Sequence, residues 1–223
     1  MEFKEVVEDR YSCKKFNGEP VAEKALKAIL EAGRVAPTAK NLQEQHVYVV
    51  QSPEKLALID ELTPCRYGAT TVLVVAFNKE NVFTYPGGTR DSGIEDATIV
   101  ATHMLLAAKN AGVDSCWVNF FNPEEVAGKL ELPENEEVLM MLDLGYAAED
   151  GKPLPQAPQR HRNLPLNISR WAVHVISKIP IQLEEAAFQP RKAASHSYRT
   201  TLALYPRLSD SSENRKSCSS NNG

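Results

Sequence analysis

Several features that mark other classes of protein are missing from this sequence of 223 residues. It has no run of about 18 apolar residues, so no segment predicts a membrane span. Residues Met1–Glu5 are largely charged and lack the apolar core of a signal peptide. The four cysteines form no C-x-x-C pair, which argues against a zinc site or a disulfide framework and suits a reducing compartment. We therefore expect a cytoplasmic protein whose cysteines are small buried or incidental residues.

The common signatures of catalysis by the protein alone are also missing. No G-x-S-x-G elbow, H-E-x-x-H pair, P-loop or G-x-G-x-x-G fingerprint occurs. The adjacent acids Glu95/Asp96 and Glu124/Glu125 fall at predicted helix starts, where they favour the helix dipole rather than acid–base chemistry. No protein nucleophile and no metal site stand out. If the chain is an enzyme, we expect a cofactor to carry the chemistry.

The charge is unevenly distributed along the chain. The formal net charge is −4. Residues 1–150 carry 14 Lys and Arg against 25 Asp and Glu, whereas residues 151–223 carry 11 against 4. An acidic body does not suit general nucleic-acid binding, so we expect a small-molecule partner and no nucleic acid or membrane partner. The basic, serine-rich end has no hydrophobic period and favours disorder.

Apolar periodicity predicts helices that alternate with strands. The fully apolar segment 71–77 indicates a strand buried on both faces of a sheet. The long segment 94–111 has many small residues and indicates a central, closely packed helix. Such alternation is typical of an α/β or α+β protein with helices over a sheet. The predicted helices are 3–10, 22–33, 53–62, 94–111 and one from 123, and the predicted strands are 47–50, 71–77, 115–121 and 138–145.

A short basic stretch, Arg10–Phe16 (RYSCKKF), follows the first predicted helix. It holds three cations, Arg10, Lys14 and Lys15, and the hydroxyl of Ser12. Such a cluster can hold a phosphate by charge-assisted hydrogen bonds. On its own it is equally typical of a solvated basic turn.

Four further motifs occur in order along the chain: Ala36–Gln43 (APTAKNLQ), Asp91–Gly93 before the long helix, Ser115–Trp117 after it, and Leu144–Tyr146 after a strand. Each motif taken alone has low specificity. Together with Arg10–Phe16, which matches R-x-S-x-(R/K)-x-F, they resemble the nitroreductase family of FMN-dependent oxidoreductases over about residues 2–165. The resemblance implies an α+β homodimer with a three-layer α/β/α fold, a central, mostly antiparallel sheet and FMN at the dimer interface.

The resemblance also implies a set of cofactor-binding residues. In one chain, Arg10, Ser12 and Lys14 would hold the phosphate, the ribityl chain and the N1/O2 edge of the flavin. Lys14 would give electrostatic support to the reduced ring. The partner chain would contribute Pro37, Thr38 and Asn41. The remaining implied residues are Tyr11, Ala39, Gln43, Asn119 and Phe120, with Arg160 or Arg162 completing the phosphate clamp.

The implied activity is ping-pong hydride transfer. NADH or NADPH would reduce the flavin at N5, and an electrophilic acceptor such as a nitroaromatic or a quinone would then reoxidise it. Two alternatives stay open at this point. One is another chemistry on the same fold, such as an oxygen-using flavin enzyme. The other is a protein that binds FMN without catalysis.

The sequence departs from the family pattern in two places. Glu44 and Gln45 stand where the family often has proline and an aromatic residue. A larger departure divides the chain into a family-like domain, residues 1–166, and an atypical tail, residues 167–223. Two interpretations of the tail stay open, disorder and a frameshifted end that is not native to the family.

Overall fold

The computed structural model describes residues 1–155. The chain in this range folds into five α-helices, one 3₁₀ turn and four strands, in a regular alternation. Their order is α1 (Phe3–Asp9), α2 (Glu23–Arg34), η1 (Ala39–Asn41), β1 (Gln45–Val50), α3 (Pro53–Leu62), β2 (Thr71–Asn78), α4 (Gly93–Asn110), β3 (Asp114–Val118), α5 (Pro123–Leu130) and β4 (Glu136–Gly145).

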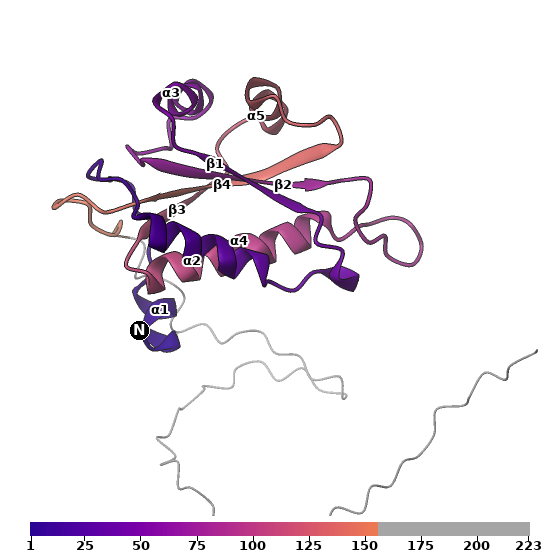
Figure 1. The fold of residues 1–223 in the computed structure, drawn as a ribbon, viewed down its shortest axis with the longest axis horizontal. Helices are drawn as coiled ribbons and strands as arrows, with labels where there is room; N and C mark the ends of the chain where they lie inside the picture. The colour runs from indigo at the N-terminus through magenta and orange to yellow at the C-terminus, as the bar shows by residue number, and fades with distance from the viewer. Residues whose placement is uncertain (156–223) are drawn as a thin grey trace, which may run out of the picture. The chain divides into compact units, whose positions relative to one another are not determined.

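The four strands form one sheet in the order β1-β2-β4-β3, and every neighbouring pair is antiparallel. Helices α2 and α4 cover one face of the sheet, and α3 and α5 cover the other (Figure 1). The described part of the chain is therefore a three-layer α+β fold, which confirms the predicted class and the antiparallel sheet.

Strand β2 forms the middle of the core, and the first seven of its eight residues are buried. Because side chains alternate along a strand, Leu73 and Val75 face the α2/α4 layer while Val72 and Val74 face the α3/α5 layer. The prediction of a strand buried on both faces is confirmed. Helix layers on both sides explain why an antiparallel strand lacks the usual polar face.

Helix α4 is the central helix of its layer, as its small residues predict. Its buried apolar residues are Ala97, Ala101 and Ala108, together with Val100 and Met104. Gly33 of α2 lies so near that a Cβ built there would come within 2.9 Å of the Met104 side chain. The small residues therefore allow α2 and α4 to pack closely against each other.

The predicted helix starts are confirmed in detail at α3 and α5. Ser52 accepts a hydrogen bond from the Lys55 amide, and Asn122 accepts one from the Glu124 amide, each before a proline at the first helical position. Three strand bounds differ from the prediction by two or three residues: β1 begins at Gln45, β3 ends at Val118, and β4 begins at Glu136. Within residues 1–155, no helix is both long and apolar enough to cross a membrane.

The start of α4 generates a test of this packing. A Cβ at Gly93 would lie 2.2 Å from the buried Phe77 ring, so Gly93→Ala is expected to lower the free energy of unfolding by about 1–3 kcal/mol. Gly128 in α5 is the matched control because nothing lies within 4 Å of its Cβ position. Gly128→Ala is expected to raise stability by up to about 1 kcal/mol. Urea denaturation measures both, and equal effects would contradict the packing described for Gly93.

Candidate functional site

The stretch Arg10–Lys14 runs beside β3 as an added edge segment. Ser12 pairs with Ser115 in a parallel bridge, and the Cys13 amide donates to the Ser115 carbonyl at 2.9 Å. Cys13 is fully buried, whereas Ser12 and Lys14 are exposed. Since extended backbone alternates its side chains, Arg10, Ser12 and Lys14 project from the same side. The structure thus brings these three predicted residues together on one surface.

This segment is tied to the body of the protein just beyond Lys14. The Phe16 amide donates to the Tyr67 carbonyl at 3.1 Å, and the Ala148 amide donates to the Lys15 carbonyl at 3.0 Å. The Phe16 ring packs over Gly145, where a Cβ would come within 2.8 Å of the ring. The cations of the segment therefore stand on a fixed backbone.

The two neighbouring lysines have different surroundings. Lys15 forms an ion pair with Asp150. Lys14 places its ammonium over the Tyr67 ring, 5.4 Å from the centroid. Of these two lysines, Lys14 is the one on the side of Ser12, so the basic stretch acts there with two cations, Arg10 and Lys14, and not with three.

Tyr11 faces the opposite side from Ser12. Its hydroxyl donates to the Gly151 carbonyl at 3.1 Å. Burial, and secondarily the nearby Asp114 carboxylate, raises the pKa of Tyr11 to about 12. Tyr11 therefore stays protonated and anchors the segment 10–14 to residues near 151.

The second predicted group, in the loop of residues 37–43, lies between α2 and β1. Its backbone is left-handed at Lys40 (φ 52°), Asn41 (φ 56°) and Gln43 (φ 57°). The Gln43 amide donates to the Thr38 hydroxyl at 3.2 Å, and the Asn41 amide donates to the Thr38 carbonyl at 3.0 Å. The loop is compact and exposes Pro37, Asn41 and Gln43.

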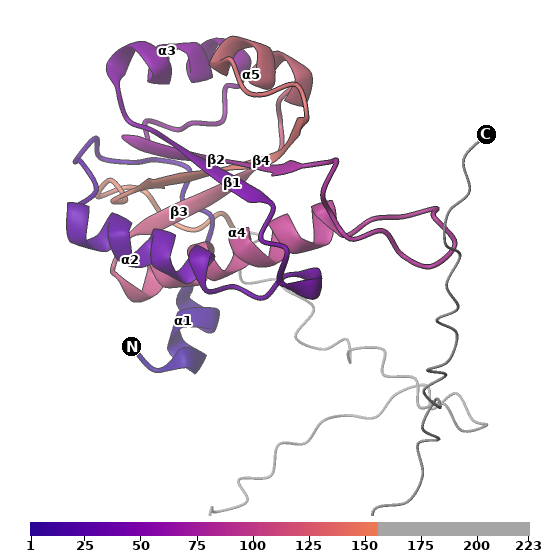
Figure 2. The same ribbon diagram turned by 45° about the vertical axis from the view of Figure 1, so that its right-hand side comes forward.

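Within one chain, the two groups lie at opposite ends of α4 (Figures 1 and 2). The Ala39 amide donates to the Asp96 carboxylate at 2.9 Å, in the first turn of α4. Ser115, the partner of Ser12, follows the other end of the helix. With 18 residues, α4 is about 27 Å long. A single chain therefore does not bring residues 37–43 to Arg10–Lys14.

Asn119 and Phe120 directly follow β3, the strand that also holds Ser12. The Trp117 indole donates to the Asn119 side chain at 2.9 Å, and the buried Thr63 hydroxyl donates to the Phe120 carbonyl at 2.7 Å. The Phe120 side chain is 73% exposed. These two predicted residues thus directly follow the strand beside which the basic segment runs, whereas Arg160 and Arg162 lie outside the described residues.

Cavities alone do not locate this site. A hollow of about 700 Å³ lies beside α5, and its lining includes Glu124, Glu131, Glu134 and Glu137. These carboxylates would repel a phosphate. A smaller cavity of about 290 Å³ adjoins Thr38 and Gln43. Within residues 1–155, no cluster of His, Cys, Asp and Glu side chains could hold a metal ion.

Burial explains why the thiols below the basic segment offer no nucleophile. It raises the pKa of the Cys13 thiol, and it raises that of Cys116 to about 12. Both side chains are buried, as predicted, and both stay protonated at neutral pH.

Sequence reasoning missed three residues around the site: Thr63, Tyr67 and Asp143. Thr63 and Tyr67 carry no local signal, because their role comes from contacts with residues distant in sequence. Asp143 had a local signal, since it is the one charged residue in the predicted strand 138–145. It is 1% exposed, and its Oδ2 has no hydrogen-bond partner among the described residues. Burial raises its pKa to about 8, although the Arg66 charge opposes this.

The raised pKa of Asp143 predicts an unusual pH dependence. Between about pH 4 and pH 8 the folded state holds a proton that the unfolded state has lost, so stability falls as pH rises. Asp143→Asn should remove this loss of stability with rising pH. The free energy of unfolding of the variant, relative to the native chain, should rise by up to about 1.4 kcal/mol per pH unit in this range. Urea denaturation at several pH values measures it.

Asp150 provides the control for this titration. The hydrogen bond from Lys15 lowers the Asp150 pKa, so its contribution is present above the ordinary pKa and is lost only as pH falls. Asp150→Asn should therefore differ from the native chain by a constant amount above about pH 5. A constant difference for Asp143→Asn as well would show that Asp143 is ionised in the folded protein.

Known proteins with similar sequences and structures share this arrangement of elements. The chain matches the Nitroreductase family over residues 7–66 and 64–146. An FMN reductase (NAD(P)H) of Bacillus subtilis is 28% identical over 188 residues, covering 75% of this chain and 76% of the relative. A NADH dehydrogenase of Thermus thermophilus is 28% identical over 184 residues, covering 67% and 88%.

A solved structure agrees with these sequence relatives. A nitroreductase family protein from Clostridium difficile 630 superposes with a TM-score of 0.71 at 29% identity, covering 78% of this chain and 100% of that protein. The family match spans more than half of the chain and includes both the basic segment beside β3 and the loop before β1. The protein therefore belongs to the nitroreductase family.

Proposed function

We propose that this protein is an FMN-dependent oxidoreductase that uses NADH or NADPH to reduce an electrophilic acceptor, such as a nitroaromatic compound or a quinone. The observation that carries the proposal is the alignment of Arg10, Ser12 and Lys14 on one side of a fixed segment. Its relatives include proteins named FMN reductase and NADPH-dependent oxidoreductase, which support both the cofactor and the reductant.

The residues present fit FMN by their chemistry. A guanidinium, an ammonium and a hydroxyl on one side form a donor set for a phosphate and a polyol chain. Arg160 and Arg162 remain proposed phosphate contacts from beyond the described residues. When bound, FMN supplies the redox chemistry by accepting a hydride and passing it on in a ping-pong sequence. No protein nucleophile is needed, which agrees with the protonated thiols of Cys13 and Cys116.

Lys14 has a separate role in this proposal. Its ammonium stands over the Tyr67 ring, which limits where it can go. A hydrogen bond with Cys65, together with burial, raises the pKa of the Tyr67 hydroxyl, so Tyr67 stays neutral beside it. A fixed positive charge at the N1/O2 edge would stabilise the negative charge of the reduced flavin. The backbone at Asn119 and Phe120 would run along the ring.

We propose a homodimer because one chain carries the two halves of the site at opposite ends of α4. In a dimer, residues Pro37, Thr38, Ala39, Asn41 and Gln43 of each chain would contact the flavin bound by the partner's basic segment. The surface around α4 supports such an interface. On this helix, Ile94 is 55% exposed and Ile99 is 36% exposed. Val35, just before the loop, and Leu42, within it, are also exposed.

We also propose that the protein acts in the cytoplasm. The thiols of Cys13, Cys65 and Cys116 are free, as is usual in a reducing compartment. No dinucleotide fingerprint in the sequence favours NADH or NADPH, so both are proposed as reductants.

The first test is spectroscopic. The purified protein should bind FMN, turn yellow, and lose its flavin absorbance anaerobically on addition of NADH or NADPH. Lys14→Ala should weaken FMN binding on the order of tenfold and slow the reduction, because a charge-assisted contact is lost. Lys15→Ala is the matched control, since Lys15 is paired with Asp150. Fluorescence titration and stopped-flow absorbance measure the two effects.

Three results would count against the proposal. A colourless protein that ignores added FMN would exclude the cofactor. Flavin that binds but is not reduced by either nucleotide would favour a binding protein without this activity. Oxidation of a bound substrate by oxygen, without a nicotinamide, would favour the oxygen-using alternative. Equal losses in Lys14→Ala and Lys15→Ala would remove the role assigned to Lys14.

The second test asks whether each flavin site is built from residues of both chains of a homodimer. Lys14→Ala and Asn41→Ala each damage both sites of a homodimer. After mixing and subunit exchange, a heterodimer of the two variants has one site with both changes and one intact site. Roughly a quarter of all sites should therefore regain native FMN affinity. Flavin titration of the mixture, compared with each variant alone, measures the recovery.

The control for complementation is a chain that carries both changes. Mixed with either single variant, the Lys14→Ala/Asn41→Ala chain cannot form an intact site. If mixing the two single variants restores nothing although exchange occurs, both groups act within one chain or only one of them contacts the flavin.

A further inference from the structure

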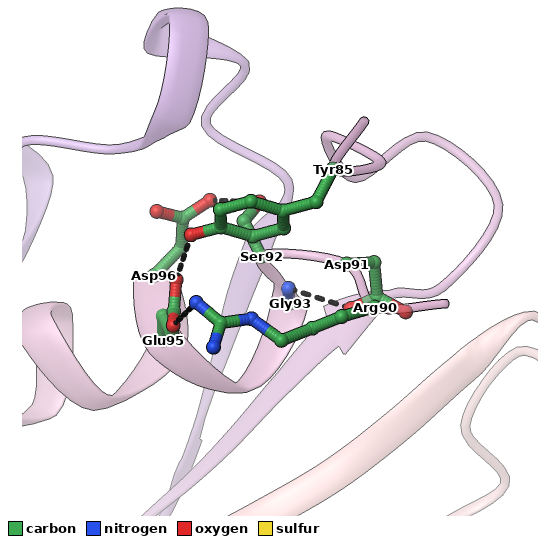
Figure 3. A network of polar contacts seen from close by, with 7 residues as sticks. All are labelled: Tyr85, Arg90, Asp91, Ser92, Gly93, Glu95 and Asp96. Atoms are coloured by element: carbon green, nitrogen blue, oxygen red, sulfur yellow. Dashed lines mark hydrogen bonds and ion pairs between the residues drawn. The ribbon is translucent and has the colours of Figure 1, made fainter. Parts of the chain in front are cut away.

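A buried carboxylate lies in the first turn of α4, next to the loop before β1. Asp96 is 4% exposed, and each of its oxygens has a partner. Oδ1 accepts from the Ala39 amide at 2.9 Å, and Oδ2 accepts from the Ser92 hydroxyl at 2.7 Å. Figure 3 shows Ser92 and Asp96 side by side at the start of the helix. The carboxylate thus joins the helix to the loop.

The position of Asp96 is itself fixed. Ser92 is 1% exposed, and its amide donates to the Phe83 carbonyl at 2.9 Å. The Gly93 amide donates to the Asp91 side chain at 2.9 Å (Figure 3). Gly93 also packs directly against the Phe77 ring, where no Cβ fits. The carboxylate can therefore act as a rigid support for the loop.

The loop that it contacts has a conformation that needs support. Lys40 and Gln43 are left-handed, which is uncommon for residues other than glycine and asparagine. The hydrogen bonds from the Asn41 and Gln43 amides to Thr38 hold the loop to itself. In the described part of the chain, the Asp96 carboxylate is the side chain that accepts a hydrogen bond from this loop across the gap to α4.

The neighbouring acid has a different set of contacts. Glu95 accepts from the Tyr85 hydroxyl and pairs with Arg90, in the hairpin that precedes α4 (Figure 3). Both acids lie in the first turn and favour the helix dipole equally. Of these two acids, Asp96 is the one that accepts a hydrogen bond from the loop of residues 38–43, which also places the Lys40 ammonium over the Phe83 ring, 4.7 Å from the centroid.

We infer that Asp96 is a positioning residue for flavin binding: its carboxylate holds the left-handed loop 38–43 in the conformation that contacts the partner subunit's flavin. This inference rests on the proposed function, which supplies the flavin contact. Asp96 does not touch the flavin. It acts through the Ala39 amide and sets the direction of two nearby loop residues, Thr38 and Asn41.

The test compares Asp96→Ala, Asp96→Asn and Glu95→Ala. Hydrogen exchange at the Ala39 amide, followed in the full chain without flavin, reports the loop. Fluorescence titration with FMN reports the site, and thermal unfolding reports overall stability. Asp96→Ala should speed exchange at Ala39 and weaken FMN binding on the order of tenfold to a hundredfold.

The two other variants separate positioning from stability. Asparagine keeps an oxygen for the Ala39 amide and can donate to the Ser92 hydroxyl, so Asp96→Asn should restore FMN affinity to within a few-fold. Glu95→Ala removes an equal charge from the same turn and should leave Ala39 exchange and FMN affinity unchanged. If FMN affinity instead follows the unfolding temperature across all three variants, Asp96 stabilises the fold only and the inference fails.

The outcomes also distinguish this inference from the proposed function. If the native chain binds FMN and Asp96→Ala binds it equally well, the inference is overturned and the function stands. If the native chain binds no FMN, the function is overturned, and unchanged exchange at Ala39 in Asp96→Ala would overturn the positioning role as well. Should Asp96→Ala fail to fold, Asp96→Ser takes its place, because its shorter side chain removes the oxygen that accepts from the Ala39 amide, and unchanged Ala39 exchange and FMN affinity in that variant would overturn the inference.

Discussion

Burial of β2 on both faces is the constraint on which the rest of this fold depends. A strand without a polar side is stable only between two apolar layers, so α2 and α4 must cover one face while α3 and α5 cover the other. The neighbouring strands β1 and β4 then satisfy its backbone on both edges. Close packing on one side requires the small residues of α4, and Gly33 and Gly93 allow the approach.

Because the interior is filled in this way, the proposed site lies at the margins of the sheet. Arg10–Lys14 adds to β3, the edge strand next to β4, and its odd residues, Tyr11 and Cys13, anchor it. Because side chains alternate along this extended segment, Arg10, Ser12 and Lys14 lie on the other side. Asn119 and Phe120 follow the same strand, β3, and the Thr63 hydroxyl donates a hydrogen bond to the Phe120 carbonyl. A rigid framework of this kind lets simple donors recognise an anionic cofactor without a deep cavity.

The length of α4 decides how the second half of the site is used. The loop of residues 37–43 lies near one end of this helix, about 27 Å long, and the basic segment lies near the other, which is why we propose a flavin site made from two chains. Dimerisation and cofactor binding would then depend on each other. Asp96 links them physically, since the helix that carries exposed Ile94 and Ile99 also supports the loop through its first turn.

Much of this protein could be predicted from the sequence because the signals are local. Apolar period, caps such as Ser52 and Asn122, and the five motifs in order were enough for the elements, the α+β class and the family. The three-layer arrangement followed from that resemblance. The bounds of β1, β3 and β4 differed by two or three residues, since pairing with a neighbour decides where a strand begins and ends.

Other properties depend on contacts between distant residues, and only the tertiary structure decided them. The sequence shows three cations in Arg10–Phe16. In the structure Lys15 forms an ion pair with Asp150, and Lys14 is the lysine on the side of Ser12. The sequence shows two equivalent acids at 95 and 96, but only Asp96 reaches Ala39. It shows one aspartate in an apolar strand, but the surrounding burial raises the Asp143 pKa to about 8. Local pattern determined which groups are available, and long-range packing determined which of them are free to act.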